Sequence, residues 1–133
     1  MDRLSILKEG NLIISKIGMF LRMVEPTLKP LFLRSEIEDG KEELKLYVED
    51  RNDGTWLKYN ILDLPDGLGK AVFLVMDLTY RKLFLSCRDC DEGKKSGGIV
   101  VLEDFLVDLH PERRKKIIEA ITKTFSNIQF VIK

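Results

Sequence analysis

Apolar and polar residues alternate most regularly between Leu44 and Leu62. Leu44, Leu46 and Val48 are separated by polar residues, and the alternation resumes after Asn52-Asp53-Gly54. Strict alternation on both sides of an Asp-Gly pair is typical of a β-hairpin. The pattern therefore predicts two antiparallel strands in this stretch.

The hairpin can close in two ways that keep its faces chemically consistent. A turn centred on Asp53-Gly54 pairs Val48 with Tyr59, whereas a loop from Arg51 to Gly54 pairs Val48 with Leu57. A slip of one residue would turn half of the apolar side chains towards water. The sequence leaves the two consistent registers open.

The same period of two precedes the hairpin, and a helical period precedes that. Alternation begins at Pro30, and Asp39-Gly40 is a turn sequence, so strands near 30–37, 43–50 and 55–62 are expected to form an antiparallel meander. From Asn11 to Val24 the apolar residues recur at helical spacing, and Pro26 prevents continuation. We expect this helix to cover one face of the meander.

Two apolar runs in the middle of the chain are continuous. Residues 71–76 read AVFLVM and residues 82–87 read KLFLSC. Runs of this kind are typical of strands buried on both faces, with residues 77–81 as the reversal. A single helix through the region is an open alternative, because periodicity does not decide short apolar runs.

The last third of the chain predicts a loop, a strand, a helix and a final strand. Residues 87–98 are polar and glycine-rich, and 99–107 resume as a strand that is bent or bulged at Glu103-Asp104. Pro111 suits the first turn of a helix, which Asn127 ends. Residues 128–132 alternate as the last strand.

These elements predict a single α+β domain over residues 1–133. We expect a mostly antiparallel sheet of about six or seven strands, with an N-terminal helix and a C-terminal helix that is followed by the last strand. A chain of 133 residues is long enough for one hydrophobic core.

Composition removes several classes of function. The chain has 22 basic and 22 acidic residues, so no overall field attracts nucleic acid. The N-terminus does not resemble a signal peptide, and no apolar run approaches the roughly 18 residues of a membrane span. Because there are only two cysteines, a disulfide framework is excluded and a cytoplasmic location is expected.

Those two cysteines, Cys87 and Cys90, form a CxxC motif that is a candidate metal or thiol site. The motif follows an expected strand, whereas a thiol oxidoreductase places it at the start of a helix. A structural zinc site needs four ligands, and the only histidine is His110. Zinc would need a second chain or a nearby aspartate, so the default expectation is no cofactor.

Other chemistry-bearing residues have structural explanations. His110 lies just before a helix-opening proline, where a side chain caps the helix. The glycines and lysine of residues 66–70 match neither common phosphate-binding spacing, and they precede an expected strand. The acidic residues lie on expected turns and exposed strand faces, which disfavours a mechanism built on paired carboxylates.

The outer face of the meander is the most suggestive surface. If Leu46 and Val48 point into the core, aromatic and basic side chains alternate on the other face. Such side chains form hot spots of protein interfaces or stack nucleic-acid bases. Simpler explanations are that Trp56 stacks under Arg51, or that the second helix covers the face. The candidate partner-binding residues are Phe32, Arg34, Tyr47, Arg51, Trp56 and Lys58.

The sequence favours a small binding or regulatory module without catalysis of its own. It would bind a protein partner or its own copy through a sheet face or edge, and no membrane. The alternatives are nucleic-acid binding on the aromatic and basic face, and a zinc or thiol function at the CxxC. With one histidine and no recognised phosphate loop, the sequence leans against an enzyme without deciding the question.

Overall fold

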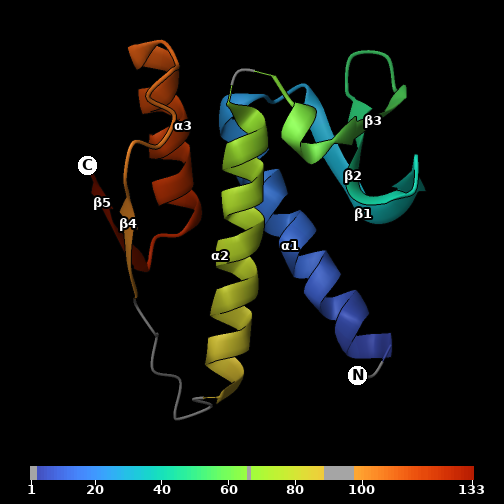
Figure 1. Cartoon of the computed structure of the whole chain (residues 1–133), viewed down its shortest axis with the longest axis horizontal. Helices are drawn as coiled ribbons and strands as arrows, with labels where there is room; N and C mark the ends of the chain where they lie inside the picture. Colours follow the sequence, from blue (N-terminus) through green and yellow to red (C-terminus); the bar gives the residue numbers. More distant parts are fainter. Residues whose placement is uncertain (1–2, 66, 89–97) are drawn as a thin grey trace.

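The structure is a computed structural model that describes residues 3–65, 67–88 and 98–133, with side chains for 11–65, 67–82 and 98–133. Figure 1 shows the arrangement, in which three long helices lie between a small sheet at each side. The elements in chain order are α1 (Arg3–Val24), β1 (Leu28–Glu38), β2 (Lys41–Asp50), β3 (Trp56–Asn60), the short 3-10 helix η1 (Ile61–Asp63), α2 (Leu68–Arg88), β4 (Gly98–Leu102), α3 (Pro111–Thr124) and β5 (Ile128–Ile132).

The expected meander is present as the antiparallel sheet β1–β2–β3. Val48 pairs with Leu57 and Leu46 pairs with Tyr59, which is the register of the longer hairpin loop. The β1–β2 turn is formed by Asp39 and Gly40, whose φ angles are 51° and 76°. Two positive φ angles in a two-residue turn match the twist of the flanking strands, which explains why an Asp-Gly pair stands there.

Helix α1 covers the inner face of this sheet, as expected. Ile17, Phe20 and Leu21 are buried together with Leu46 and Val48 of β2. The helix begins earlier than expected, at Arg3, and runs through Gly10. A glycine inside a helix costs only about 1 kcal/mol relative to alanine, so tertiary packing readily outweighs it.

The two central strands expected over 71–76 and 82–87 are wrong. Both runs belong to the single helix α2, the alternative that the sequence left open. Val72, Val75 and Thr79 are buried, whereas Phe73 and Tyr80 are exposed, so burial follows the helical period. Helix α2 packs against both α1 and α3 and so needs a wide apolar face, and the exposed Phe73 makes the apolar run continuous.

The C-terminal third forms a strand–helix–strand unit. The β4 and β5 strands pair in parallel through their whole lengths, joined by α3. Helix α3 begins at Pro111, and His110 caps it as expected, since its Nδ1 accepts a hydrogen bond from the Glu112 amide at 3.2 Å. The expected last strand is confirmed as β5, but the strand expected over 99–107 ends at Leu102.

The predicted six- or seven-stranded sheet is therefore also wrong. The described residues contain five strands in two separate sheets, one of three antiparallel strands and one of two parallel strands. The difference arises because the two central runs are helical and α2 separates the strands that they were expected to join (Figure 1). In the described part of the chain, no helix combines the length and apolar character that crossing a membrane requires.

Candidate functional site

The exposed side of the antiparallel sheet, here called the outer sheet face, carries an aromatic cluster. The rings of Phe32 and Tyr47 stack with centroids 4.5 Å apart, and Trp56 meets Phe32 edge-on at 6.2 Å. Trp56 is 63% exposed. The C-terminal helix, α3, does not cover this face, although one of the simpler explanations required it. Three of the six predicted partner-binding residues thus lie together at the surface.

The basic residues predicted for this face are distributed less favourably. Lys58 forms an ion pair with Glu36 at 3.0 Å, and Arg34 lies opposite Lys45 in the β1–β2 register. Arg51 lies in the β2–β3 turn, and Trp56 is opposite Glu49 instead of Arg51. Stacking of Trp56 under Arg51 is therefore not what the strand register favours.

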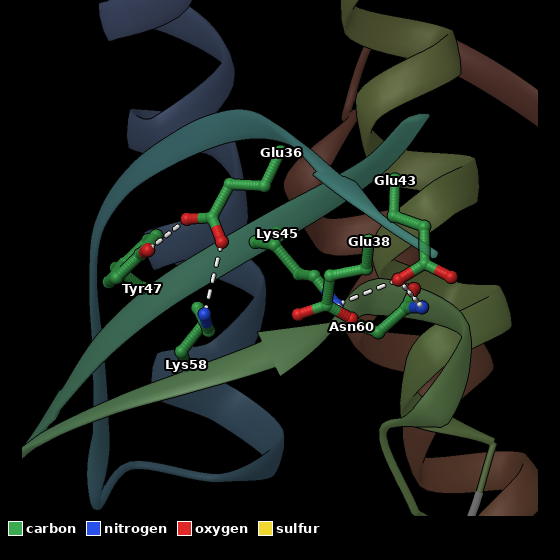
Figure 2. A network of polar contacts seen from close by, with 7 residues as sticks. All are labelled: Glu36, Glu38, Glu43, Lys45, Tyr47, Lys58 and Asn60. Carbon is green, nitrogen blue, oxygen red and sulfur yellow. Dashed lines mark hydrogen bonds and ion pairs between the residues drawn. The ribbon is translucent and has the colours of Figure 1, made fainter. Parts of the chain in front are cut away.

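Carboxylates compensate the lysines of the outer sheet face, as Figure 2 shows. Lys45, only 5% exposed, contacts Glu43 at 2.8 Å and Glu38 at 3.1 Å. Glu36 accepts hydrogen bonds from the Tyr47 hydroxyl and the Lys58 ammonium. The face thus carries acidic and basic side chains in pairs and is not a continuous basic strip. This pairing weakens its electrostatic attraction for phosphates.

These contacts shift the pKa values of their members in matching directions. The Tyr47 hydroxyl, and then Lys58, hold the pKa of Glu36 below its ordinary value, and Lys45 does the same for Glu43. The same bonds raise the pKa of Tyr47 and of Lys45. A hydrogen bond to the charged form of a carboxyl favours that form. These contacts therefore stabilise Glu36 and Glu43 in their ionised forms.

The predicted cysteine site cannot be assembled from the described residues. Cys87 belongs to the last turn of α2, so the motif begins at the end of a helix and not at the end of the expected strand. Cys90 lies outside the described residues. The histidine considered as a further ligand, His110, caps α3.

A second candidate site lies where β4 ends, in residues 103–110, here called the strand-end segment. Glu103 and Asp104 follow directly on the apolar strand and are both exposed. Asp104 has a φ of 51° and Leu106 a φ of 58°, conformations that side chains larger than glycine adopt rarely and at a cost of roughly 1–3 kcal/mol. Backbone strain of this kind clusters at functional sites, which draws attention to Asp104 and to its neighbour Glu103.

Several contacts fix the strained backbone. The Asp104 amide donates to the Lys133 carbonyl at 3.1 Å, which extends the β4–β5 ladder by one step. The Arg114 Nε donates to the Phe105 carbonyl at 2.8 Å, and the Leu106 side chain is buried in the core. The segment is therefore positioned from both sides, by β5 and by α3.

The strand-end segment lies next to the beginning of α2. Together with η1 and the residue after it, the two line an open cavity of about 200 Å³. Its lining residues are Leu62, Leu64, Gly67, Gly69, Lys70, Leu106, Asp108 and Leu109. Figure 1 shows the start of α2 and the chain between β4 and α3 at the same end of the molecule. Lys70 and Asp108 are thus brought to one cavity from distant parts of the sequence.

The glycines at the start of α2 have a packing explanation. A Cβ at Gly67 would lie 2.5 Å from Leu109 Cδ1, and one at Gly69 would lie 2.4 Å from the Ile61 carbonyl oxygen. This stretch opens a helix, so the expectation that it precedes a strand is wrong. The glycines nevertheless serve close contacts within the chain, which accounts for them without a bound phosphate.

Carboxylates at the end of a parallel strand are suited to a hard cation. Ligands of open parallel sheets bind at the carboxyl ends of the strands, and Mg²⁺ prefers carboxylate oxygens. Among the described residues, no group of three or more histidine, cysteine, aspartate or glutamate side chains could hold a metal without further ligands. By their chemistry, Glu103 and Asp104 could supply one or two carboxylate ligands.

Sequence reasoning missed these two acids for a specific reason. The sequence predicts a strand that continues to Val107, in which Glu103 and Asp104 form a bend or a bulge. The signal that marks them is the direct passage from four apolar residues to two acidic ones, Ile-Val-Val-Leu to Glu-Asp. This signal acquires meaning only once the strand is known to be parallel and to end there.

Two curated proteins are similar to parts of this chain. The chain is 28% identical over 98 residues to the retron Ec83 probable ATPase of Escherichia coli, which is 74% of this chain and 17% of that protein. It is 29% identical over 73 residues to the retron Vc95 probable ATPase of Vibrio cholerae serotype O1 biovar El Tor, which is 55% of this chain and 14% of that protein. No family model matches the chain.

The matched segments are thus about a sixth of the relatives' lengths. The similarity contradicts the predicted function, a module without catalysis, because both relatives carry the name of a probable ATPase. That prediction rests on the lack of a recognised phosphate loop and of a second histidine.

Proposed function

We propose that this chain functions as part of an ATPase and that its strand-end segment helps to hold the Mg²⁺ of Mg²⁺-ATP. The observation that carries the proposal is the similarity, over 98 residues, to a protein named a probable ATPase. The position of Glu103 and Asp104 at the carboxyl end of a parallel strand supports it.

The donor set fits magnesium. Mg²⁺ keeps several waters and is usually bound by one or two carboxylates together with substrate phosphates, without an all-protein cage. Glu103 and Asp104 are exposed, and within the described part of the chain neither carboxylate forms an ion pair. When bound, the ion would neutralise charge that develops on the transferred phosphoryl group.

The phosphate-binding loop would come from other polypeptide. The pattern G-x-x-x-x-G-K-[S/T] does not occur in the 133 residues. The matched segment accounts for only 17% of the Escherichia coli relative, so most of that protein lies outside it. We therefore propose that this chain supplies the carboxylates that bind Mg²⁺ and that the remainder of the enzyme supplies the loop that binds the phosphates.

Two further expectations belong to the same proposal. The outer sheet face, with its exposed Trp56, would be a contact surface between this part of the ATPase and another protein. The use of only two cysteines supports a cytoplasmic location.

A chimeric enzyme tests the proposal directly. The match covers 98 of the 133 residues, so the whole chain replaces the matching segment of the retron Ec83 probable ATPase together with its immediate flanks. Phosphate release from Mg²⁺-ATP is measured for the chimera and its variants. We expect Asp104→Asn or Glu103→Gln to lower kcat by about 100-fold or more, because a catalytic cation contributes several kcal/mol to transition-state stabilisation.

The matched control is Glu112→Gln, which removes an exposed acid from the first turn of α3. This variant should keep the rate of the parent chimera. Circular dichroism of each variant would show that the fold is retained. If the chimera hydrolyses ATP and neither strand-end variant changes the rate, Glu103 and Asp104 do not hold the metal.

A further inference from the structure

The parallel pair β4–β5 has an apolar face that no described element covers. Ile99 is 70% exposed and Val101 is 50% exposed, and Val101 pairs with the partly exposed Val131. Ile99 pairs with the exposed Gln129, which is the one polar residue on this side of the pair. The opposite side of the pair, with Val100 and Phe130, packs against the core. We call the surface of Ile99, Val101 and Val131 the open face.

The edges of the pair are also open. Among the described residues, each of the two strands has only the other as a sheet neighbour. The β4 strand reads Gly-Ile-Val-Val-Leu and has no charged residue, proline or bulge. Natural proteins use such features to protect a free edge, so an unprotected apolar strand is a template for further pairing.

Two parallel strands with one bare face are an incomplete structure on physical grounds. Parallel sheets occur almost only with both faces covered, and their strands are apolar on both sides for that reason. Sheets of two strands are at best marginally stable by themselves. The sequence of β4 suits the interior of a larger sheet, not its surface.

We propose that β4 and β5 are two strands of a larger parallel sheet, completed by the phosphate-binding part of the ATPase, whose further strands pair with the open edges and whose helix covers the open face. This inference rests on the proposed function. The covering segment would be a strand with apolar residues on both sides, connected to a helix with an apolar stripe.

Two observations favour this occupant. The two relatives contain about five to six times as much polypeptide outside the matched segment as within it, since the segment is 17% and 14% of their lengths. Parallel strands of one sheet also end at the same edge, so a phosphate-binding loop at the end of a neighbouring strand would lie beside Glu103 and Asp104.

A second copy of this chain suits the surface less well. Two β4 edges related by a twofold axis perpendicular to the sheet would pair in antiparallel fashion and extend the sheet on both sides. Both open faces would then still be exposed to water. Only an occupant that brings both strands and a helix satisfies the edges and the open face together.

The test compares Val101→Lys in the isolated chain and in the chimeric ATPase described above. In the isolated chain we expect the melting temperature to shift by less than about 2 °C, because the side chain is half exposed. In the chimera we expect a fall of more than about 5 °C, because a lysine would be buried against a covering helix. The control is Ile37→Lys on β1, a residue 77% exposed, which should be silent in both proteins.

Hydrogen exchange of the unsubstituted proteins gives a second measurement. Amides of β4 should exchange at least about 10-fold more slowly in the chimera than in the isolated chain, whereas those of β2 should exchange similarly. Equal exchange of β4 in both proteins, or a chimera that is insoluble where its parent is soluble, would overturn the inference. A dimer of the isolated chain that Val101→Lys dissociates would assign the open face to a second copy and also overturn it.

Failure of this inference and failure of the proposed function can be told apart. Asp104→Asn leaves the open face intact, so it should lower hydrolysis without changing the protection of β4 amides. If β4 becomes protected in the chimera but Asp104→Asn hydrolyses ATP normally, the sheet is completed and the metal assignment is wrong. The reverse result would retain the metal site and reject sheet completion.

Discussion

The two sheets of this molecule differ in how far they are complete. The antiparallel sheet is closed by hairpins within a few residues, and α1 covers its inner face. Its outer face is polar apart from the aromatic cluster, and β1 carries Pro30 and a bulge at its edge. The parallel sheet has two short strands that are apolar except for Gln129, one uncovered face and unprotected edges.

This difference separates what a local sequence can stabilise from what needs distant polypeptide. Hairpins bring their partners together over short loops, so all the strand partners of the antiparallel sheet lie inside residues 28–60. Parallel strands need long crossovers, and here one crossover supplies only one pair. The antiparallel sheet therefore has its strand partners within the chain. The parallel pair is the region that we expect to gain further strands when the ATPase assembles.

The largest expected effect is the difference in unfolding free energy between shortening a buried residue of the antiparallel sheet and shortening an exposed residue of the parallel sheet. Leu46→Ala on β2 removes a fully buried side chain, so we expect the free energy of unfolding of the isolated chain to fall by about 2–5 kcal/mol. Ile99→Ala on β4 should lower it by less than about 0.5 kcal/mol. Urea denaturation followed by circular dichroism measures both. Equal losses would show that the open face is buried in the isolated chain, and the comparison of the sheets would no longer hold.

A smaller difference in stability is expected between alanine substitutions at two glycines that both have left-handed backbone conformations. Gly54 in the β2–β3 turn has a φ of 74° and open space around its Cα, whereas Gly67 has a φ of 79° and Leu109 Cδ1 at 2.5 Å from the Cβ position. Alanine costs about 1 kcal/mol for the backbone at either site. We expect Gly67→Ala to cost about 1 kcal/mol more, through the added displacement of Leu109.

The measurement for this pair is again the midpoint of urea unfolding. Similar losses for Gly54→Ala and Gly67→Ala would mean that Leu109 turns away without cost. In that case the contact between the start of α2 and the strand-end segment is loose, and the cavity between them would adapt to a ligand more readily than the structure indicates.

The sequence was sufficient for the antiparallel sheet because its information is local. Alternation fixed the faces of β2 and β3, and Asp39-Gly40 marked one turn. The register was left between two options because both keep Val48 on the apolar face, and the structure has the pairing with Leu57. The helix cap at His110 was likewise predictable, since a cap depends on residues within one turn.

The remainder depended on information that no short window contains. A continuous apolar run fits a buried strand and a helix packed on two sides equally well, so α2 was mistaken for two strands. The acids Glu103 and Asp104 gain significance from the end of β4 and its parallel pairing with β5, a contact about 30 residues away in the sequence. The aromatic cluster was found because its members lie on neighbouring antiparallel strands.

The smallest expected effect is a difference in acid sensitivity between the two sheets. The pKa values of Glu36 and Glu43 lie below the ordinary 4.5, so their ionised forms stabilise the folded antiparallel sheet above that pH. As the pH falls through this range towards the lowered values, the unfolded chain takes up protons first and that stabilisation is lost. The β4 and β5 strands contain no titratable residue and should be unaffected directly. Hydrogen exchange at pH 6 and pH 3.5, corrected for the intrinsic rate, should therefore show protection lost in β2 more than in β4, and Glu36→Gln should reduce the difference. A larger loss in β4 than in β2 would contradict the stabilising role given to Glu36 and Glu43.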